Sequence, residues 1–213
     1  MSSGSKSPHT EKFKRGLSFS EIAKALAGEG LETDVLDRGE RAKKENRFVF
    51  EASWEVVNKV GGIYQVLRSK APVSVEELGD QYCMLGPYVP DKYRLEVEPL
   101  EPDSGAMHFA LESLENMGIK AYFGRWLIDG YPKVVLFDVG SAAWKLDQWK
   151  GEVWEMTHIG IPTHDRETND ALIFGFCCAI FVQKFRERLS ATPQPLVVAH
   201  FHEWNGGIGL LPL

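Results

Sequence analysis

The sequence predicts an α/β fold in which helices cover both faces of a parallel β-sheet. Segments typical of strands and of helices alternate along the chain, which is the order that a parallel sheet requires. The strand segments are continuous apolar runs without period-two alternation, as expected for strands buried on both faces. In such sheets, ligands bind beyond the carboxyl ends of the strands.

The first half of the chain begins with a predicted strand at 47–52 and a loop at 58–62. A helix is predicted from Gly62 to Lys70, and Pro72 is expected to end it. The next segments are predicted as a strand at 82–85, a helix at 111–117, strands at 120–126 and 133–139, and a helix at 142–149.

A long helix is predicted behind Asp165, which has the properties of an N-cap, with Glu167 in the first turn. It runs to about Leu189 and is apolar nearly all round, so we expect it to be buried on most sides. The last strand is predicted at 196–200. Residues 206–213 should open a further helix, and we therefore expect a truncated or alternatively ended chain.

Composition and charge exclude several classes of protein. The 213 residues carry a formal net charge of −6, which disfavours nucleic acid as a partner. Cys83, Cys177 and Cys178 lie in apolar runs and are expected to be buried free thiols, which suits a reducing compartment. The longest apolar run, 171–182, is too short to span a membrane, and the first residues lack the apolar core that we would expect of a signal peptide. We expect a cytoplasmic protein.

Residues 1–46 are predicted to form a flexible polar tail. Ser20 is placed to cap a short helix at 21–27. Lys14 and Arg15 precede Ser18 in the pattern that basophilic kinases prefer, and Ser18 and Ser20 are our candidate regulatory phosphorylation sites. Phosphate on Ser18 would add up to about two negative charges beside those cations. An unmodified charged tail is the alternative.

The loop that contains Lys59, Gly61 and Gly62 suits a phosphate group. Its glycines allow a ligand to approach the backbone, and the following helix offers free N–H groups and the positive end of its dipole. The spacing is neither that of a Walker A loop nor that of a dinucleotide fingerprint. A tight strand-to-helix turn with an exposed lysine explains the pattern equally well.

A second polar stretch follows the last predicted strand. His200 and His202 point the same way if the strand continues through them. Either a hydrogen bond to a substrate hydroxyl or a structural role would explain a histidine here. Zinc is disfavoured, because no third ligand has suitable spacing. Burial in the core is the expectation for four tryptophans: Trp126, Trp144, Trp149 and Trp154.

Four segments together resemble the signatures of animal and fungal glycogen synthases. They are EVVNKVGGIY at 55–64, YFGRWLI at 122–128, DRETNDALIFG at 165–175 and VVAHFHEW at 197–204. The resemblance runs in unbroken order from about residue 48 to about residue 209. Residues 15–18 also resemble the regulatory phosphoserine segment of that family, although Glu21 stands where a second serine is expected.

The resemblance implies a retaining glucosyltransferase with two Rossmann-like domains that face each other across a cleft, an arrangement called GT-B. Such an enzyme transfers glucose from UDP-glucose to the non-reducing end of glycogen as an α-1,4 bond, with no metal or other cofactor. Lys59, Gly61 and Gly62 would bind the donor, and His202 would be the catalytic residue at the sugar. Also implied are a tetramer, glycogenin as a partner, activation by glucose 6-phosphate, and restraint by phosphorylation.

On this reading, residues 47–213 are the incomplete N-terminal domain, and the second nucleotide-binding domain is absent. Half a cleft cannot preorganise charges around the leaving diphosphate, so we expect the chain alone to be inactive. Asn205 and Gly206 stand where the family has a Leu-Ala pair. Two alternatives remain: a non-catalytic module or short isoform that binds glycogenin or full-length synthase, and a generic nucleotide-binding α/β domain.

Overall fold

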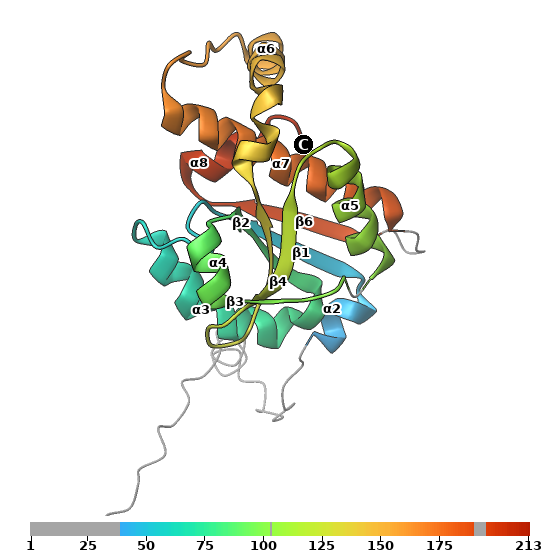
Figure 1. The fold of residues 1–213 in the computed structure, drawn as a ribbon. Helices are drawn as coiled ribbons and strands as arrows, with labels where there is room; N and C mark the ends of the chain where they lie inside the picture. Colours follow the sequence, from blue (N-terminus) through green and yellow to red (C-terminus); the bar gives the residue numbers. More distant parts are fainter. Residues whose placement is uncertain (1–38, 103, 190–194) are drawn as a thin grey trace, which may run out of the picture. The chain divides into compact units, whose positions relative to one another are not determined.

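The structure of the protein is a computed structural model (Figure 1), and it describes residues 39–102, 104–189 and 195–213. Ser18, Ser20 and the helix predicted at 21–27 lie outside the described residues.

The strands of the described residues form one six-stranded sheet in the order β3-β4-β5-β2-β1-β6. The strands are β1 (Arg47–Ala52), β2 (Tyr82–Pro87), β3 (Val97–Pro99), β4 (Ala121–Trp126), β5 (Lys133–Phe137) and β6 (Leu196–Phe201). Strands β1, β2, β5 and β6 are parallel, which confirms the predicted α/β fold. Strand β4 is an exception and runs antiparallel to β3 and β5. The connection from β4 to β5 is too short for the crossover that a parallel pair requires.

Helices lie on both faces of this sheet, with α5 and α7 on one face and α3 on the other (Figure 1). The helices within the described residues are α2 (Glu40–Lys44), α3 (Ile63–Leu78), α4 (Pro90–Glu96), α5 (Gly105–Asn116), α6 (Leu146–Thr157), α7 (Arg166–Arg188) and α8 (Glu203–Gly207). Short 3₁₀ turns are η1 (Gly79–Gln81), η2 (Val139–Lys145) and η3 (Ile208–Leu210). Helix α2 falls inside the stretch expected to be a tail, and its Ala42 is fully buried.

The core has two parts, one on each face of the sheet, because successive side chains of a strand point to opposite faces. Phe50 and Ala52 of β1 belong to the cluster under α5 and α7. Tyr82 and Met84 of β2 belong to the cluster under α3. Glu51 lies between Phe50 and Ala52 and therefore points toward α3, where it is fully buried. A carboxylate thus occupies a core position of the central sheet.

Two further predictions, on helix capping and on cysteine burial, are confirmed. Asp165 caps α7, because its side chain accepts hydrogen bonds from the backbone N–H groups of Glu167 and Thr168. All three cysteines are buried, as predicted. In the part of the chain that the structure describes, no helix combines the length and the apolar character that crossing a membrane would need.

Other predictions were wrong in their boundaries or their burial. Pro72 lies inside α3 rather than ending it, and the helix continues to Leu78 because buried residues such as Ala71 hold that face against the sheet. Helix α4 and strand β3 were not predicted. Among the tryptophans, Trp126 and Trp149 are buried as expected, whereas Trp144 and Trp154 are 64% and 53% exposed.

Candidate functional site

The carboxyl ends of β1 and β6 lie side by side. The parallel register pairs Ala52 with Phe201, the last residues of the two strands. The backbone N–H of His202 donates to the carbonyl oxygen of Ala52 at 2.9 Å, so the pairing extends one residue further. The two stretches that the sequence analysis singled out, far apart in the chain, therefore meet at one edge of the sheet.

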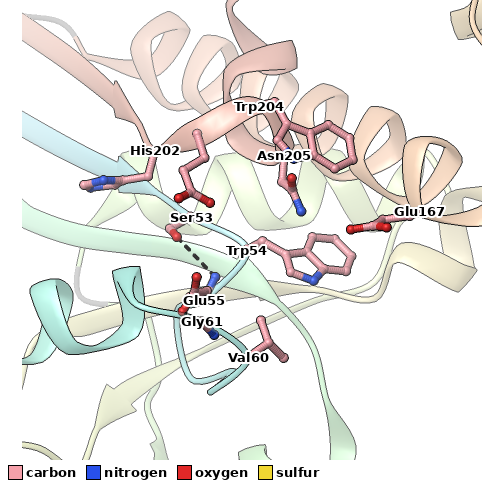
Figure 2. A pocket seen from close by; sticks show the side chains of 10 residues that line it. Ser53, Trp54, Glu55, Val60, Gly61, Glu167, His202, Trp204 and Asn205 are labelled. Carbon is pink, nitrogen blue, oxygen red and sulfur yellow. Dashed lines mark hydrogen bonds between the residues drawn. The ribbon is translucent and has the colours of Figure 1, made fainter.

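A cavity of about 380 Å³ opens at this edge (Figure 2). Its walls come from the β1–α3 loop (Ser53, Trp54, Glu55, Val60 and Gly61), from the first turn of α7 (Glu167) and from the segment 202–205. Of the predicted site residues, Gly61 and His202 line the cavity. Lys59 and Gly62 do not line it, but they are exposed in the same loop.

The first turn of α3 is capped by a carboxylate of the chain itself. Oε2 of Glu55 accepts hydrogen bonds from the backbone N–H groups of Gly61, at 2.9 Å, and Tyr64, at 2.8 Å. Glu55 is buried. The carboxylate of Glu55 therefore binds part of the helix N-terminus where the sequence predicted a phosphate. Glu55 was not among the predicted site residues. An acidic residue shortly before a Gly-rich helix start is the signal that could have found it.

The two glycines of the loop have different surroundings. A Cβ atom on Gly61 would lie 2.6 Å from Oε1 of Glu55, so any larger residue would displace the carboxylate from its capping position. A Cβ atom on Gly62 would meet nothing within 4 Å. Gly61 therefore serves the fold of the loop, and Gly62 faces open space that a ligand can enter. Lys59 lies beside it, with Nζ 5.9 Å from the centroid of the Tyr64 ring.

Backbone strain marks both sides of the cavity. Val57, in the β1–α3 loop, has φ of 54°, and Glu203, directly after His202, also has φ of 54°. Residues other than glycine rarely adopt this left-handed region, and a buried β-branched residue such as Val57 is a pronounced exception. Strain of this kind costs about 1–3 kcal/mol per residue and is concentrated at functional sites.

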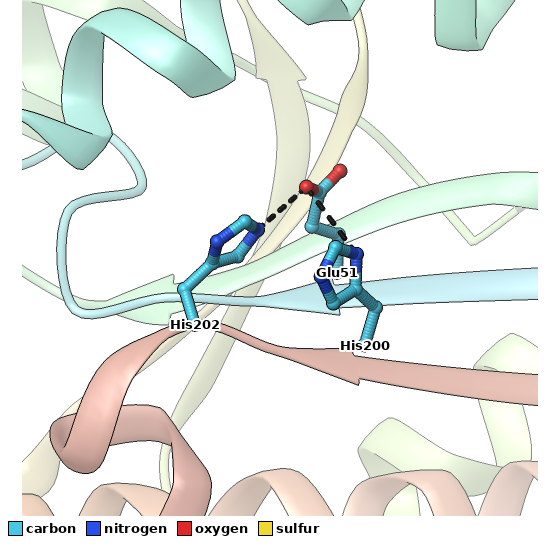
Figure 3. A group of neighbouring side chains, drawn as sticks. All are labelled: Glu51, His200 and His202. Carbon is cyan, nitrogen blue, oxygen red and sulfur yellow. Dashed lines mark hydrogen bonds and ion pairs between the residues drawn. The ribbon is translucent and has the colours of Figure 1, made fainter.

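The imidazole of His202 points away from Ser53 and Trp54 and toward the buried Glu51 (Figures 2 and 3). Its Nε2 lies 2.7 Å from Oε1 of Glu51. The ring of His200 is next to it, with Nδ1 at 3.7 Å from the same oxygen.

Two further groups hold the Glu51 carboxylate. Nζ of Lys70, on α3, donates to Oε1 at 2.7 Å, and the hydroxyl of Tyr82 donates to Oε2. Burial by itself raises the pKa of Glu51, but the hydrogen bonds from His202, Lys70 and Tyr82 outweigh that cost and bring the pKa to about 2. Burial and the neighbouring carboxylate raise the pKa of Tyr82. Burial, with the proximity of His202, lowers the pKa of His200.

The atoms of Glu51, His200 and His202 that could coordinate a metal lie within 4.8 Å of one another. The prediction that no third ligand accompanies the two histidines was wrong, because Glu51 of the neighbouring strand lies beside them. The chemistry of the cluster is nevertheless that of an ion-pair network. The ammonium of Lys70 already binds the oxygen that faces both histidines, and a metal ion there would be repelled by it.

Comparisons with known proteins agree with the resemblance. Residues 51–213 match the glycogen synthase family. The chain is 55% identical over 207 residues to glycogen (starch) synthase of Caenorhabditis elegans, which covers 96% of this chain and 31% of that protein. It is 47% identical over 167 residues to the human liver enzyme of that name, covering 78% of this chain and 23% of the relative. It is 40% identical over 174 residues to the glycogen (starch) synthase of Neurospora crassa, covering 82% of this chain and 24% of that protein. The chain thus spans between 23% and 31% of the length of these relatives.

Proposed function

The chain belongs to the glycogen synthase family, and on that premise we propose that it contributes the N-terminal part of a retaining, UDP-glucose-dependent glucosyltransferase. The reaction is transfer of glucose to the non-reducing end of glycogen as an α-1,4 bond. The observation that carries this proposal is the meeting of the Gly61–Gly62 loop and His202 at neighbouring carboxyl ends of parallel strands, around one cavity. This edge of a parallel sheet is where ligands bind.

The roles of the site residues follow from their surroundings. Lys59 is an exposed cation beside the glycine pair, and it supplies a point charge to the phosphates of the donor. The open space at Gly62 lets those phosphates reach the backbone at the start of α3. Gly61 maintains the shape of the loop by admitting the carboxylate of Glu55. His202 is the candidate catalytic residue, which hydrogen bonds a hydroxyl of the glucose.

The remaining proposals concern the whole protein of which these residues would form a part. We propose a GT-B enzyme whose second domain closes over the donor, so that residues 47–213 alone bind the donor weakly and transfer no glucose. Glycogen is the acceptor, glycogenin is a partner, and the active assembly is a cytoplasmic tetramer associated with glycogen. Glucose 6-phosphate activates it, and phosphorylation at Ser18 and Ser20 of a flexible tail (1–46) restrains it.

Titration of the 213-residue chain with UDP-glucose, followed by amide NMR, tests the donor site. We expect the amide chemical shifts of residues 59–63 to change on binding. The affinity for UDP-glucose should fall at least several-fold in Lys59→Ala, because a charged hydrogen bond contributes about 1.5–3 kcal/mol. Lys44→Ala removes an exposed cation from α2 and is the matched control. Donor binding that is equal in Lys59→Ala and Lys44→Ala would contradict the proposed role of Lys59.

Incubation of the purified chain with UDP-glucose and glycogen tests the second statement. The expected result is no transfer of glucose above background. Clear transfer by the 213-residue chain would show that the catalytic groups are complete within it, and the proposed dependence on a second domain would be withdrawn.

A second candidate function, a non-catalytic binding module, is favoured by one observation. Among the strands that the structure describes, β6 lies at the edge of the sheet, and on its α3-side face Leu196 and Val198 are 56% and 41% exposed. An exposed edge strand with apolar side chains is a surface suited to protein contacts. Co-purification of the chain with glycogenin or with full-length synthase would favour this role, and the substitution Val198→Lys should then abolish it.

A further inference from the structure

We propose that Glu51 is a positioning residue for His202, which fixes the ring so that Nε2 carries a proton and Nδ1 is left as the hydrogen-bond acceptor for a sugar hydroxyl. The first half of this statement concerns only the chain itself. The second half rests on the proposed function of His202.

The geometry around Glu51 determines the direction of the hydrogen bond. Lys70 donates to Oε1 and the hydroxyl of Tyr82 donates to Oε2, so the carboxylate is surrounded by donors and serves as an acceptor on both oxygens. A group in that position accepts from Nε2 of His202, at 2.7 Å, and Nε2 must then carry the proton. In a neutral imidazole the other nitrogen, Nδ1, is the acceptor.

The backbone and the burial of Glu51 make this arrangement rigid. Glu51 is 0% exposed and comes from the interior strand β1, which is paired on both sides, with β2 and β6. The backbone N–H of His202 is bound to Ala52, the next residue of the same strand. The ring of His202 is bound to Glu51 and its backbone to Ala52, two consecutive residues of β1, so the imidazole has little freedom to turn.

The same contacts connect the two halves of the candidate site. Helix α3 carries the Gly61–Gly62 loop at its start and Lys70 two turns later. Lys70 binds Glu51. Glu51 in turn binds His202 (Figure 3). A chain of charged contacts therefore fixes the histidine relative to the helix whose N-terminus is proposed to bind the donor phosphates.

His200 lacks the short contact with Glu51 that fixes the ring of His202. Its Nδ1 lies 3.7 Å from Oε1 of Glu51, beyond hydrogen-bond distance, and its side chain is 49% exposed. It is packed against His202, with ring centroids 4.4 Å apart. His200 is thus the natural control, because it is the same residue type beside the same carboxylate without the short contact.

Proton and nitrogen NMR of the histidine rings in the 213-residue chain tests the proposal. We expect a ring N–H signal on Nε2 of His202 that exchanges slowly with solvent, and His202→Gln identifies it by its loss. The signal should persist in His200→Gln. It should also persist in Glu51→Gln, whose amide oxygen still accepts, and disappear in Glu51→Met, which offers no acceptor.

Two results would overturn the positioning role. One is a His202 ring without a protected proton on Nε2 in the wild-type chain, a measurement that needs no variant to fold. The other is a protected signal that survives in folded Glu51→Met. Addition of UDP-glucose separates this proposal from the proposed function. If Nε2–H is protected but the Nδ1 signal does not change at saturating UDP-glucose, the positioning role of Glu51 stands and the proposed contact between His202 and the sugar is contradicted.

Discussion

The carboxylate of Glu55 accepts a hydrogen bond from the backbone N–H of Tyr64, nine residues later, at a distance of 2.8 Å. With its second bond, to the N–H of Gly61, it closes the β1–α3 loop into a fixed shape. Two backbone N–H groups at the start of α3 are thereby satisfied before any ligand arrives, and the loop is preorganised by the chain itself.

Replacement of Glu55 by alanine should destabilise the protein. Two backbone N–H groups would lose a charged, buried acceptor, and a helix cap alone contributes about 0.5–2 kcal/mol. With both hydrogen bonds lost, we expect the free energy of unfolding to fall by about 2–3 kcal/mol, measured by urea titration. Glu115→Gln, on the exposed face of α5, is the control and should change it by less than about 0.5 kcal/mol. A Glu55→Ala protein as stable as this control would mean that the cap has no energetic role.

The neighbouring glycines form a matched pair with opposite expectations. In Gly61→Ala, the new Cβ would lie 2.6 Å from Oε1 of Glu55 and force the carboxylate out, so we expect a loss of about 1–3 kcal/mol. In Gly62→Ala, the new Cβ enters open space at φ of −81°, so stability should stay equal or rise by about 0.4–1 kcal/mol.

In contrast to its stability, the affinity of the Gly62→Ala variant for UDP-glucose should fall. If the donor phosphates enter the open space there, Gly62→Ala should bind UDP-glucose more weakly than the wild-type chain although it folds as well. Equal losses of stability in the two alanine variants would contradict the assignment of separate roles to these glycines.

The low pKa of Glu51 predicts a particular dependence of stability on pH. Its pKa falls from 4.5 to about 2 in the folded protein, so folding favours the ionised form. The resulting stabilisation is fully present above about pH 4.5 and is lost as the pH falls toward 2. A shift of this size corresponds to about 3 kcal/mol, because one pKa unit is about 1.4 kcal/mol.

Urea titrations of wild type and Glu51→Gln at several pH values measure this contribution. The difference between their free energies of unfolding should shrink by about 2 kcal/mol between about pH 6 and about pH 3. The same comparison with Glu115→Gln should give a nearly constant difference. A constant difference for Glu51→Gln as well would show that this carboxylate is not held ionised by its partners.

Asn205 is expected to limit stability. Its Oδ1 is buried and has no hydrogen-bond partner among the described residues, and an unsatisfied buried acceptor costs about 1–3 kcal/mol. Asn205→Leu should therefore raise the free energy of unfolding by about 1 kcal/mol in a thermal or urea experiment. Asn58→Leu is the control of opposite sign, because the Asn58 amide donates to the Trp54 carbonyl oxygen at 3.0 Å. A less stable Asn205→Leu would indicate that the amide is bound after all.

Local patterns in the sequence were sufficient for much of the architecture. Continuous apolar runs identified β1, β2, β5 and β6, and Asp165 identified the start of α7, because strand burial and helix capping depend on neighbouring residues. The loop with Lys59 and the two glycines was also predicted, because its signal lies within a few consecutive residues. Boundaries failed where distant contacts decided them, as at Pro72, where the packed face of α3 outweighs the proline.

The amino-acid pattern was enough to predict that two polar stretches follow strand ends and what chemistry each could offer. That Glu51 and Glu55 bind these stretches is visible only in the folded chain. Glu51 lies 151 positions from His202 in the chain, and no local pattern relates the two. Burial gives each carboxylate its role, because an acidic group removed from water must be surrounded by donors, and those donors are the histidine, the lysine and the backbone N–H groups of the candidate site.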